Sequence, residues 1–252
     1  MTFPWPFRTA LSAFTFALDP DNVQIWQVGL QQTPATLAQL QGLLNAEEQQ
    51  RASRFHFPAD QRRYIVGRGT LRVLLGHYLQ IPPAQLAFTY NAYGKPQLAR
   101  VPATLPVHFN LSHSGEHALY AIAQQRIVGI DIEWIRTNID YLDLARHVFS
   151  PYEQAVLAAL PLTEQRAAFY RGWTRKEAFI KARGMGLSLP LEQFDVTLQA
   201  DLPPQLLATR DDPQEVGRWG LCDLPCPSGY AAALVVAGHG WRTTLWKADE
   251  VG

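Results

Sequence analysis

Two carboxylates alternate with apolar residues in the segment Val128-Gly-Ile-Asp-Ile-Glu133. This alternation predicts a β-strand, which places Asp131 and Glu133 on one face. Two like charges side by side favour a bound cation, and hard oxygen ligands suit Mg²⁺, which completes its shell with water and substrate phosphates. A strand with one solvated face has the same pattern, so the pair indicates a metal site only in combination with other residues.

An acid and a base fall on one stripe of a second segment, Trp173-Thr-Arg-Lys-Glu-Ala-Phe-Ile-Lys181. Helical spacing of four residues aligns Trp173, Glu177 and Lys181. A Glu to Lys pair in this order is also an ordinary surface contact of helices. Trp173 favours an inward-facing stripe, because a large aromatic ring is seldom left in water.

Donors suited to phosphate occur in three further places. The polar run Asn110-Leu-Ser-His-Ser-Gly115 predicts a loop whose hydroxyl, amide and imidazole groups bind phosphate. Tyr93-Gly-Lys-Pro96 predicts a tight turn that presents a cation. A cluster of arginines could hold a polyphosphate, although a solvated helix face would show the same pattern. It comprises Arg51, Arg54, Arg62, Arg63, Arg68 and Arg72.

The bulk composition limits the class of protein. Lys+Arg and Asp+Glu both number 22 among 252 residues, so no long-range field favours a nucleic acid or membrane partner. No run approaches the ~18 consecutive apolar residues of a membrane span. Only two cysteines, Cys222 and Cys226, are present, which is too few for a disulfide framework. We expect a soluble cytoplasmic protein whose charge chemistry is local.

An internal repeat relates the two halves of the chain. Residues 23–28 correspond to 128–133, and Asn45 and Ser150 are equivalent N-caps, each followed three residues later by a glutamate. Apolar residues recur at helical spacing in 61–79 and 164–183. We therefore predict an α+β fold, a pseudo-dimer of two similar α/β subdomains at 1–125 and 126–252. Each is a small antiparallel sheet packed on a long helix, with the active site in the cleft between them, and the chain is expected to be a monomer.

Four segments, taken in order, resemble the surfactin-type, broad-specificity 4′-phosphopantetheinyl transferase family. They are Gly94-Lys-Pro96, Asn110-Leu-Ser-His-Ser114, Val128-Gly-Ile-Asp-Ile-Glu133 and Trp173-Thr-Arg-Lys-Glu-Ala-Phe-Ile-Lys181. The resemblance implies transfer of the 4′-phosphopantetheine arm of coenzyme A to a serine of apo acyl, peptidyl or aryl carrier proteins. It also implies Mg²⁺ as cofactor and release of 3′,5′-adenosine bisphosphate.

The resemblance implies roles for individual residues. Asp131, Glu133 and Glu177 are the implied metal ligands, and Glu177, Lys181 and Asp131 the implied catalytic residues. The implied coenzyme contacts are Arg51, Arg63, Lys95, Pro96, Ser112, His113, Lys176 and Lys181. Among these, Arg63 would bind the 3′-phosphate, and the turn at Lys95 would bind the adenine.

One residue departs from the family pattern, because Glu48 stands where a family member has a lysine near the 3′-phosphate. An acid cannot bind phosphate, so Arg51 or Arg54 would have to take over.

Two other functions use the same residues. A Mg²⁺-dependent phosphodiesterase that cleaves nucleotide pyrophosphates with water would also need three acids and a lysine. A non-catalytic module could hold carrier proteins or coenzyme A without turnover. Product analysis with and without a carrier protein separates these alternatives.

Overall fold

The computed structural model describes residues 16–100 and 106–248. The first half of the chain forms β1 (Asn22–Gly29), α1 (Pro34–Gly42), α2 (Ala46–Ser53), α3 (Pro58–Leu79), β2 (Phe88–Tyr90), β3 (Pro96–Leu98), β4 (Val107–Ser114) and β5 (His117–Gln124). The second half forms β6 (Val128–Trp134), α4 (Tyr141–Val148), α5 (Pro151–Ala159), α6 (Leu162–Arg183), β7 (Phe194–Val196), β8 (Leu206–Thr209), β9 (Trp219–Asp223), β10 (Tyr230–Ala237) and β11 (Arg242–Ala248).

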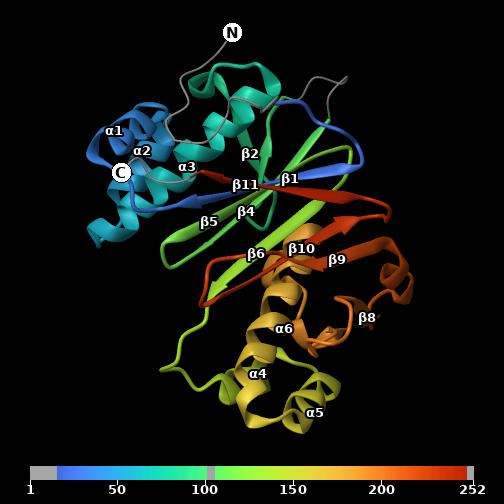
Figure 1. Ribbon diagram of the computed structural model, residues 1–252. Coiled ribbons are helices and arrows are strands. Elements are labelled where there is room, and N and C mark those ends of the chain that lie inside the picture. The colour runs from blue at the N-terminus through green and yellow to red at the C-terminus, as the bar shows by residue number, and fades with distance from the viewer. Residues whose placement is uncertain (1–15, 101–105, 249–252) are drawn as a thin grey trace.

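Two sheets lie between two groups of helices (Figure 1). The first has the strand order β11-β1-β5-β4 and the second β6-β10-β9. A buried apolar cluster joins the facing sides of the sheets and includes Val23 and Ile25 of β1 and Ile130 and Ile132 of β6. Separate clusters bury α3 against the first sheet and α6 against the second. The predicted α+β architecture is therefore confirmed.

The helices repeat between the two halves. The predicted long helices are present as α3 and α6, each of 22 residues. Both predicted capping boxes form, because Asn45 and Ser150 accept from the backbone N–H three residues on while Glu48 and Glu153 accept from the cap backbone. Local sequence therefore fixes where α2 and α5 begin.

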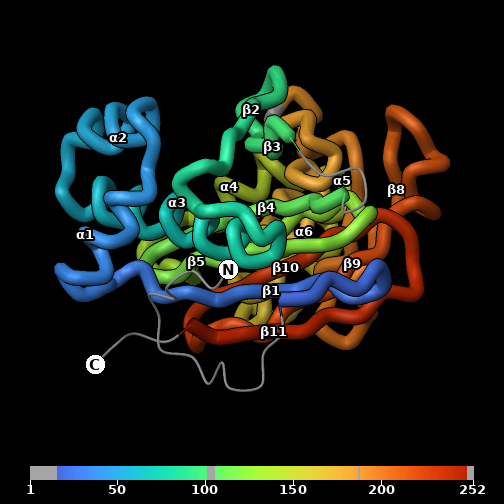
Figure 2. Tube along the Cα trace, turned by 90° about the horizontal axis from the view of Figure 1, so that it is seen from above, coloured from blue at the N-terminus to red at the C-terminus, as the bar shows by residue number. Residues whose placement is uncertain are grey.

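The last strand crosses back to the first sheet. β11 runs parallel to β1, with Val23 opposite Thr243 and Ile25 opposite Leu245 (Figure 2). The other strands of that sheet pair antiparallel, as predicted, so the sheet as a whole is mixed. A parallel pair needs a long crossover, and here residues 30–241, nearly the whole chain, lie between the two strands. The division of the chain at residue 125 stays a prediction.

A close approach between β6 and α6 sets the geometry of the second half. A Cβ on Gly129 would lie 2.0 Å from the carbonyl oxygen of Ala178 and 2.3 Å from the amide nitrogen of Ala182. Only a residue without a side chain lets the helix backbone lie this near the strand. Because side chains alternate along a strand, Asp131 and Glu133 share the face of Gly129 and point toward α6.

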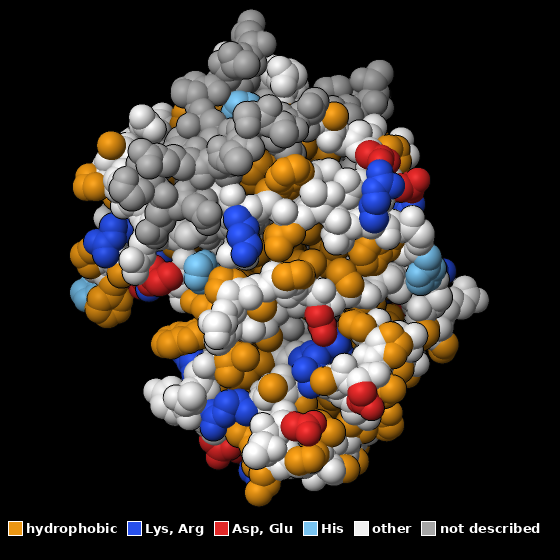
Figure 3. Space-filling model, viewed as in Figure 1, with side chains coloured by type: hydrophobic (Ala, Val, Ile, Leu, Met, Phe, Trp, Pro, Cys, Tyr) orange, Lys and Arg blue, Asp and Glu red, His pale blue; other side chains and the backbone are white. Residues whose placement is uncertain are grey.

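Acidic and basic side chains are interspersed on the face shown in Figure 3, in keeping with the net charge of zero. Across residues 16–100 and 106–248, no helix has both the length and the apolar character required to cross a membrane.

Candidate active site

Side chains of β4 join the two halves of the molecule. Asn110 accepts a hydrogen bond from the backbone N–H of Ile130 at 2.8 Å, and Ser112 donates to Asp131 Oδ1 at 2.8 Å. Ser114 donates to Glu133 Oε2 at 2.8 Å. These alternate residues share one face of β4, and Ser112 and Ser114 meet the carboxylates of β6.

The run 110–115 is therefore not the loop that its polarity predicted. Residues 107–114 form a strand, and the turn begins at Gly115. Polar side chains alternate here because they face the carboxylates of β6, not because the segment lies in solvent. This spacing of two residues was the signal that could have identified the strand.

Lys181 completes a polar cluster at this junction. Its Nζ lies 2.6 Å from Asp131 Oδ1 and 2.8 Å from Ser112 Oγ. The Asp131 side chain is almost fully buried, with 3% exposure, whereas that of Lys181 is 28% exposed. Three predicted site residues from β4, β6 and α6 thus meet at one carboxylate oxygen.

Two more carboxylates add negative charge around this cluster. Burial, followed by the charge of Asp131, raises the pKa of both Glu133 and Glu177. Lys181 opposes this rise in both cases. The charge of Asp131 therefore disfavours the ionised forms of Glu133 and Glu177, and the site favours either a proton or a cation.

The donor set fits a magnesium ion. Asp131 Oδ2 is buried and has no hydrogen-bond partner among the described residues, so one oxygen remains available to a ligand. The described residues contain no group of three or more His, Cys, Asp or Glu side chains with the spacing of a complete metal site. Mg²⁺ commonly needs only one or two protein carboxylates, because water and substrate phosphates fill the remaining positions.

A pocket of about 260 Å³ opens beside Glu177 and Lys181. It is lined by the turn between β2 and β3, by β4 and by the end of α6, with Tyr93, Gly94, Lys95, Pro96, Asn110, Leu111, Glu177, Ile180, Lys181, Gly184 and Gly186. The predicted turn at Lys95 and Pro96 is thus brought to the predicted catalytic helix. The ammonium of Lys95 contacts backbone carbonyls, including that of Lys181 at 2.5 Å.

His113 and Arg51 lie nearer the surface. Although the His113 ring is exposed, partial desolvation and then the charges of Lys181 and Arg63 lower its pKa, so it lies near both cations. The exposed Arg51 places its guanidinium 5.5 Å from the centre of the Tyr64 ring. Their contacts to coenzyme A stay predictions.

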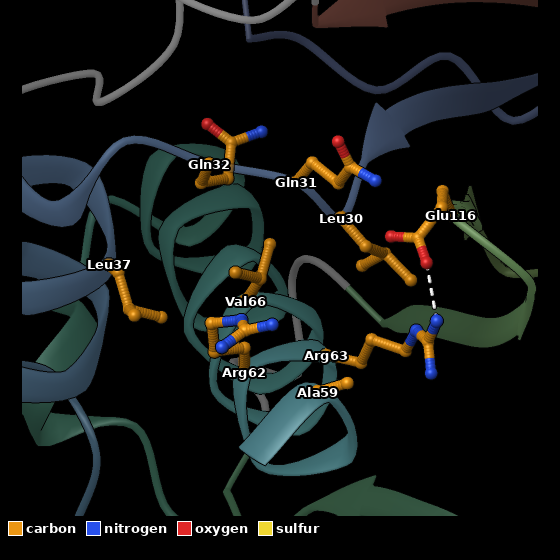
Figure 4. Close-up of a pocket in the computed structure, with 9 residues that line it drawn as sticks. All are labelled: Leu30, Gln31, Gln32, Leu37, Ala59, Arg62, Arg63, Val66 and Glu116. Atoms are coloured by element: carbon orange, nitrogen blue, oxygen red, sulfur yellow. Dashed lines mark hydrogen bonds and ion pairs between the residues drawn. The ribbon is translucent and has the colours of Figure 1, made fainter.

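Arg63 is held between two carboxylates. It contacts Asp60 Oδ1 at 3.0 Å and also pairs with Glu116 in the turn between β4 and β5 (Figure 4). Arg63 and Glu116 border a second pocket, of about 390 Å³, between α1, α3 and that turn. A phosphate bound by Arg63 would have to compete with both acids, so its 3′-phosphate role stays a prediction.

Comparison with known proteins identifies the family. Residues 127–235 match the model of the 4′-phosphopantetheinyl transferase superfamily, and residues 29–125 match that of the 4′-phosphopantetheinyl transferase N-terminal region. The chain is 38% identical over 226 residues to the 4′-phosphopantetheinyl transferase HetI of Nostoc sp., across 90% of this chain and 92% of that protein. This chain belongs to the 4′-phosphopantetheinyl transferase superfamily. It is also 37% identical over 158 residues to Sfp of Bacillus subtilis, across 63% of this chain and 68% of that protein.

Lys176 of this family member is buried in an ion pair. Its side chain is 1% exposed, and its Nζ lies 2.7 Å from Glu153 and 2.8 Å from the carbonyl of Leu191. This burial speaks against the expected contact of Lys176 with the coenzyme, which stays a prediction. Lys176 directly precedes Glu177, so its side chain lies on a different face of α6 and enters the core beneath the helix. Glu153, which is the equivalent of Glu48 in the internal repeat, holds it there.

Glu48 has a structural role that explains the departure from the family pattern. It is 3% exposed and pairs with Arg72 at 2.7 Å and with Arg68. Burial alone would raise its pKa, but hydrogen bonds from Arg72 and Arg68 outweigh burial and lower it. The acid therefore anchors α2 to α3, and it removes two of the clustered arginines from the set that could hold polyphosphate.

Proposed function

We propose that this chain transfers the 4′-phosphopantetheine arm of coenzyme A to a serine of an apo acyl, peptidyl or aryl carrier protein. The observation that carries the proposal is the meeting of Lys181, Asp131 and Ser112 beside two further acids. Membership of the transferase superfamily supports the same reaction.

The reaction forms a bond between the carrier serine oxygen and the β-phosphorus of coenzyme A. The bond from that phosphorus to the bridging oxygen breaks, and 3′,5′-adenosine bisphosphate leaves with the bond's electron pair. Negative charge grows on the pyrophosphate oxygens, and catalysis of such transfers depends mainly on positioning and on cations. Lys181, partly exposed at the pocket, is suited to neutralise that charge.

Glu177 is the proposed general base for the serine hydroxyl. Burial and the charge of Asp131 raise its pKa, which moves the group toward the operating pH and makes it a better proton acceptor. Asp131, Glu133 and Glu177 would hold Mg²⁺. When bound, the ion would neutralise the pyrophosphate and orient it.

Intact-mass measurement tests the proposal directly. Several purified apo-carrier proteins are incubated with coenzyme A and Mg²⁺, and each accepted carrier should gain the mass of one phosphopantetheinyl group. Asp131→Asn, which keeps the side-chain volume but removes the charge, should abolish the gain while the protein stays folded. Excess chelator should do the same.

Two outcomes would favour the alternatives. Release of adenosine bisphosphate and phosphopantetheine from coenzyme A without any carrier would indicate a phosphodiesterase. Coenzyme or carrier binding without a mass change for any carrier would indicate a non-catalytic module.

A further inference from the structure

The turn between β2 and β3 contacts the end of the catalytic helix. α6 ends at Arg183, and Gly184 has a left-handed conformation with φ of 68°. The last carbonyls of a helix lack partners within the helix and need donors from elsewhere. Asn91 Nδ2 donates to the carbonyl of Gly184 at 2.7 Å, and Lys95 Nζ contacts the carbonyls of Lys181 and Ala182 at 2.5 and 3.4 Å.

Lys95 also ties this helix end to the metal-site strand. Its Nζ lies 3.3 Å from the carbonyl of Val128, where β6 begins. A cation at a helix C-terminus is favourable because the negative end of the helix dipole lies there. Burial lowers the pKa of Lys95 to about 8, as expected for an ammonium withdrawn from water. With its donors on carbonyls, this ammonium stabilises protein structure and is not aimed at a ligand.

The same turn is rigid by its own hydrogen bonds. Asn91 Oδ1 accepts from the backbone N–H groups of Tyr93 and Lys95, both at 2.9 Å, and Gly94 has a φ of 81°. The turn belongs to the first half of the chain and α6 to the second. A fixed turn can therefore set where the end of α6 lies.

Lys181 is held through both its backbone carbonyl and its side-chain ammonium. Its carbonyl receives Lys95, and its side chain reaches Asp131 and Ser112. Glu177 lies one helical turn earlier and lines the same pocket as the turn. A shift of the helix end would move both groups relative to Asp131.

We propose that Lys95, supported by Asn91, is a positioning residue that fixes the end of α6 and thereby places Glu177 and Lys181 for the transfer. The inference rests on the proposed function. It assigns to the Lys95 side chain a contact with the helix in place of the predicted contact with coenzyme A.

The test compares four variants. Lys95→Met removes the cation and keeps a flexible side chain, and Lys95→Arg restores the charge. Asn91→Asp keeps the oxygen that forms the turn but loses the donor to Gly184. Lys247→Met, which removes an exposed lysine of β11, is the matched control.

Lys95→Met should lower kcat by roughly 10- to 100-fold, because misplacing a reacting group by about 1 Å has effects of this size. KM for coenzyme A should change by less than about threefold, since most of the implied coenzyme contacts lie outside α6. Lys95→Arg should recover part of kcat, and Asn91→Asp should lose less than Lys95→Met. The control should match the wild type.

Hydrogen exchange gives a readout that does not depend on turnover. Backbone amides of residues 180–185 should exchange faster in Lys95→Met and Asn91→Asp than in the wild type. Unchanged exchange together with unchanged kcat would overturn the inference. A loss confined to KM would make Lys95 a coenzyme ligand instead. If the wild type modifies no carrier, the proposed function fails, while hydrogen exchange still decides whether Lys95 fixes the helix.

Discussion

Gly129→Ala tests the contact that places α6 on β6. The added Cβ would lie 2.0 Å from the carbonyl oxygen of Ala178, whereas a comfortable carbon–oxygen contact is about 3.3 Å. The second neighbour, the amide nitrogen of Ala182, is at 2.3 Å. Both are backbone atoms of α6, so neither can rotate away, and the helix must move from the strand by roughly 1 Å.

The expected penalty is at the upper end of the range for overpacked cores, about 3 kcal/mol or more. For a chain of this size that corresponds to a fall in Tm of roughly 6–12 °C. A shift of about 1 Å should also lower kcat by roughly 100-fold, because Glu177 and Lys181 move relative to Asp131. Urea unfolding and thermal unfolding measure the stability, and carrier mass shift measures kcat.

Gly42→Ala is the matched control. Gly42 ends α1, and a Cβ there meets no described atom within 4 Å. This variant should stay within about 1 kcal/mol of the wild type, because alanine also favours the helix. A Gly129→Ala protein with the same stability and the same kcat as Gly42→Ala would refute the close packing of α6 on β6.

Three further perturbations follow from the site and the fold. Lys181→Ala should lower kcat by about 100-fold or more, and Lys181→Arg should recover much of it if the residue acts through its charge. Near-normal turnover of Lys181→Ala in single-turnover mass spectrometry would contradict this. Burial and then the charge of Asp131 raise the pKa of Glu133 and Glu177 above the ordinary value of 4.5. The stability of the metal-free protein should therefore fall as the pH rises from 4.5 through the raised pKa values, and Mg²⁺ should raise Tm more near neutral pH than at about pH 5. Equal effects of Mg²⁺ at both pH values in thermal scans would contradict this. Glu48→Ala leaves two buried arginines of α3 unpaired and should cost roughly 3–5 kcal/mol in urea unfolding, whereas a loss under about 1 kcal/mol would show that the pair is dispensable.

Local sequence determined the long helices and β6. Helical spacing predicted both long helices, and the capping boxes at Asn45 and Ser150 fixed where α2 and α5 begin. Alternation predicted β6 and put Asp131 and Glu133 on one face. These features depend on residues only a few positions apart, so they can be read without knowing the partners of each segment.

Partners of the polar side chains were decided by the tertiary structure. Glu48 and Lys176 are polar residues near the predicted site, yet each is buried in an ion pair with a residue at least 20 positions away. The sequence shows only that such a side chain needs a partner when it is buried, and it does not show whether the partner is a ligand or another element. Lys95 illustrates the same limit, because its ammonium contacts the end of α6 from 86 positions away.

The meeting of the two halves was likewise a tertiary result. The sequence predicts a loop at Ser112 and Ser114, because polar runs between apolar segments usually lie in solvent. In the folded chain they form a strand, since β6 supplies carboxylates that take the place of water. The pairing of β11 with β1, which lie at opposite ends of the described chain, likewise depends on the tertiary structure. Strand pairing depends on which backbone edges the packed layers leave adjacent, and no local pattern records that.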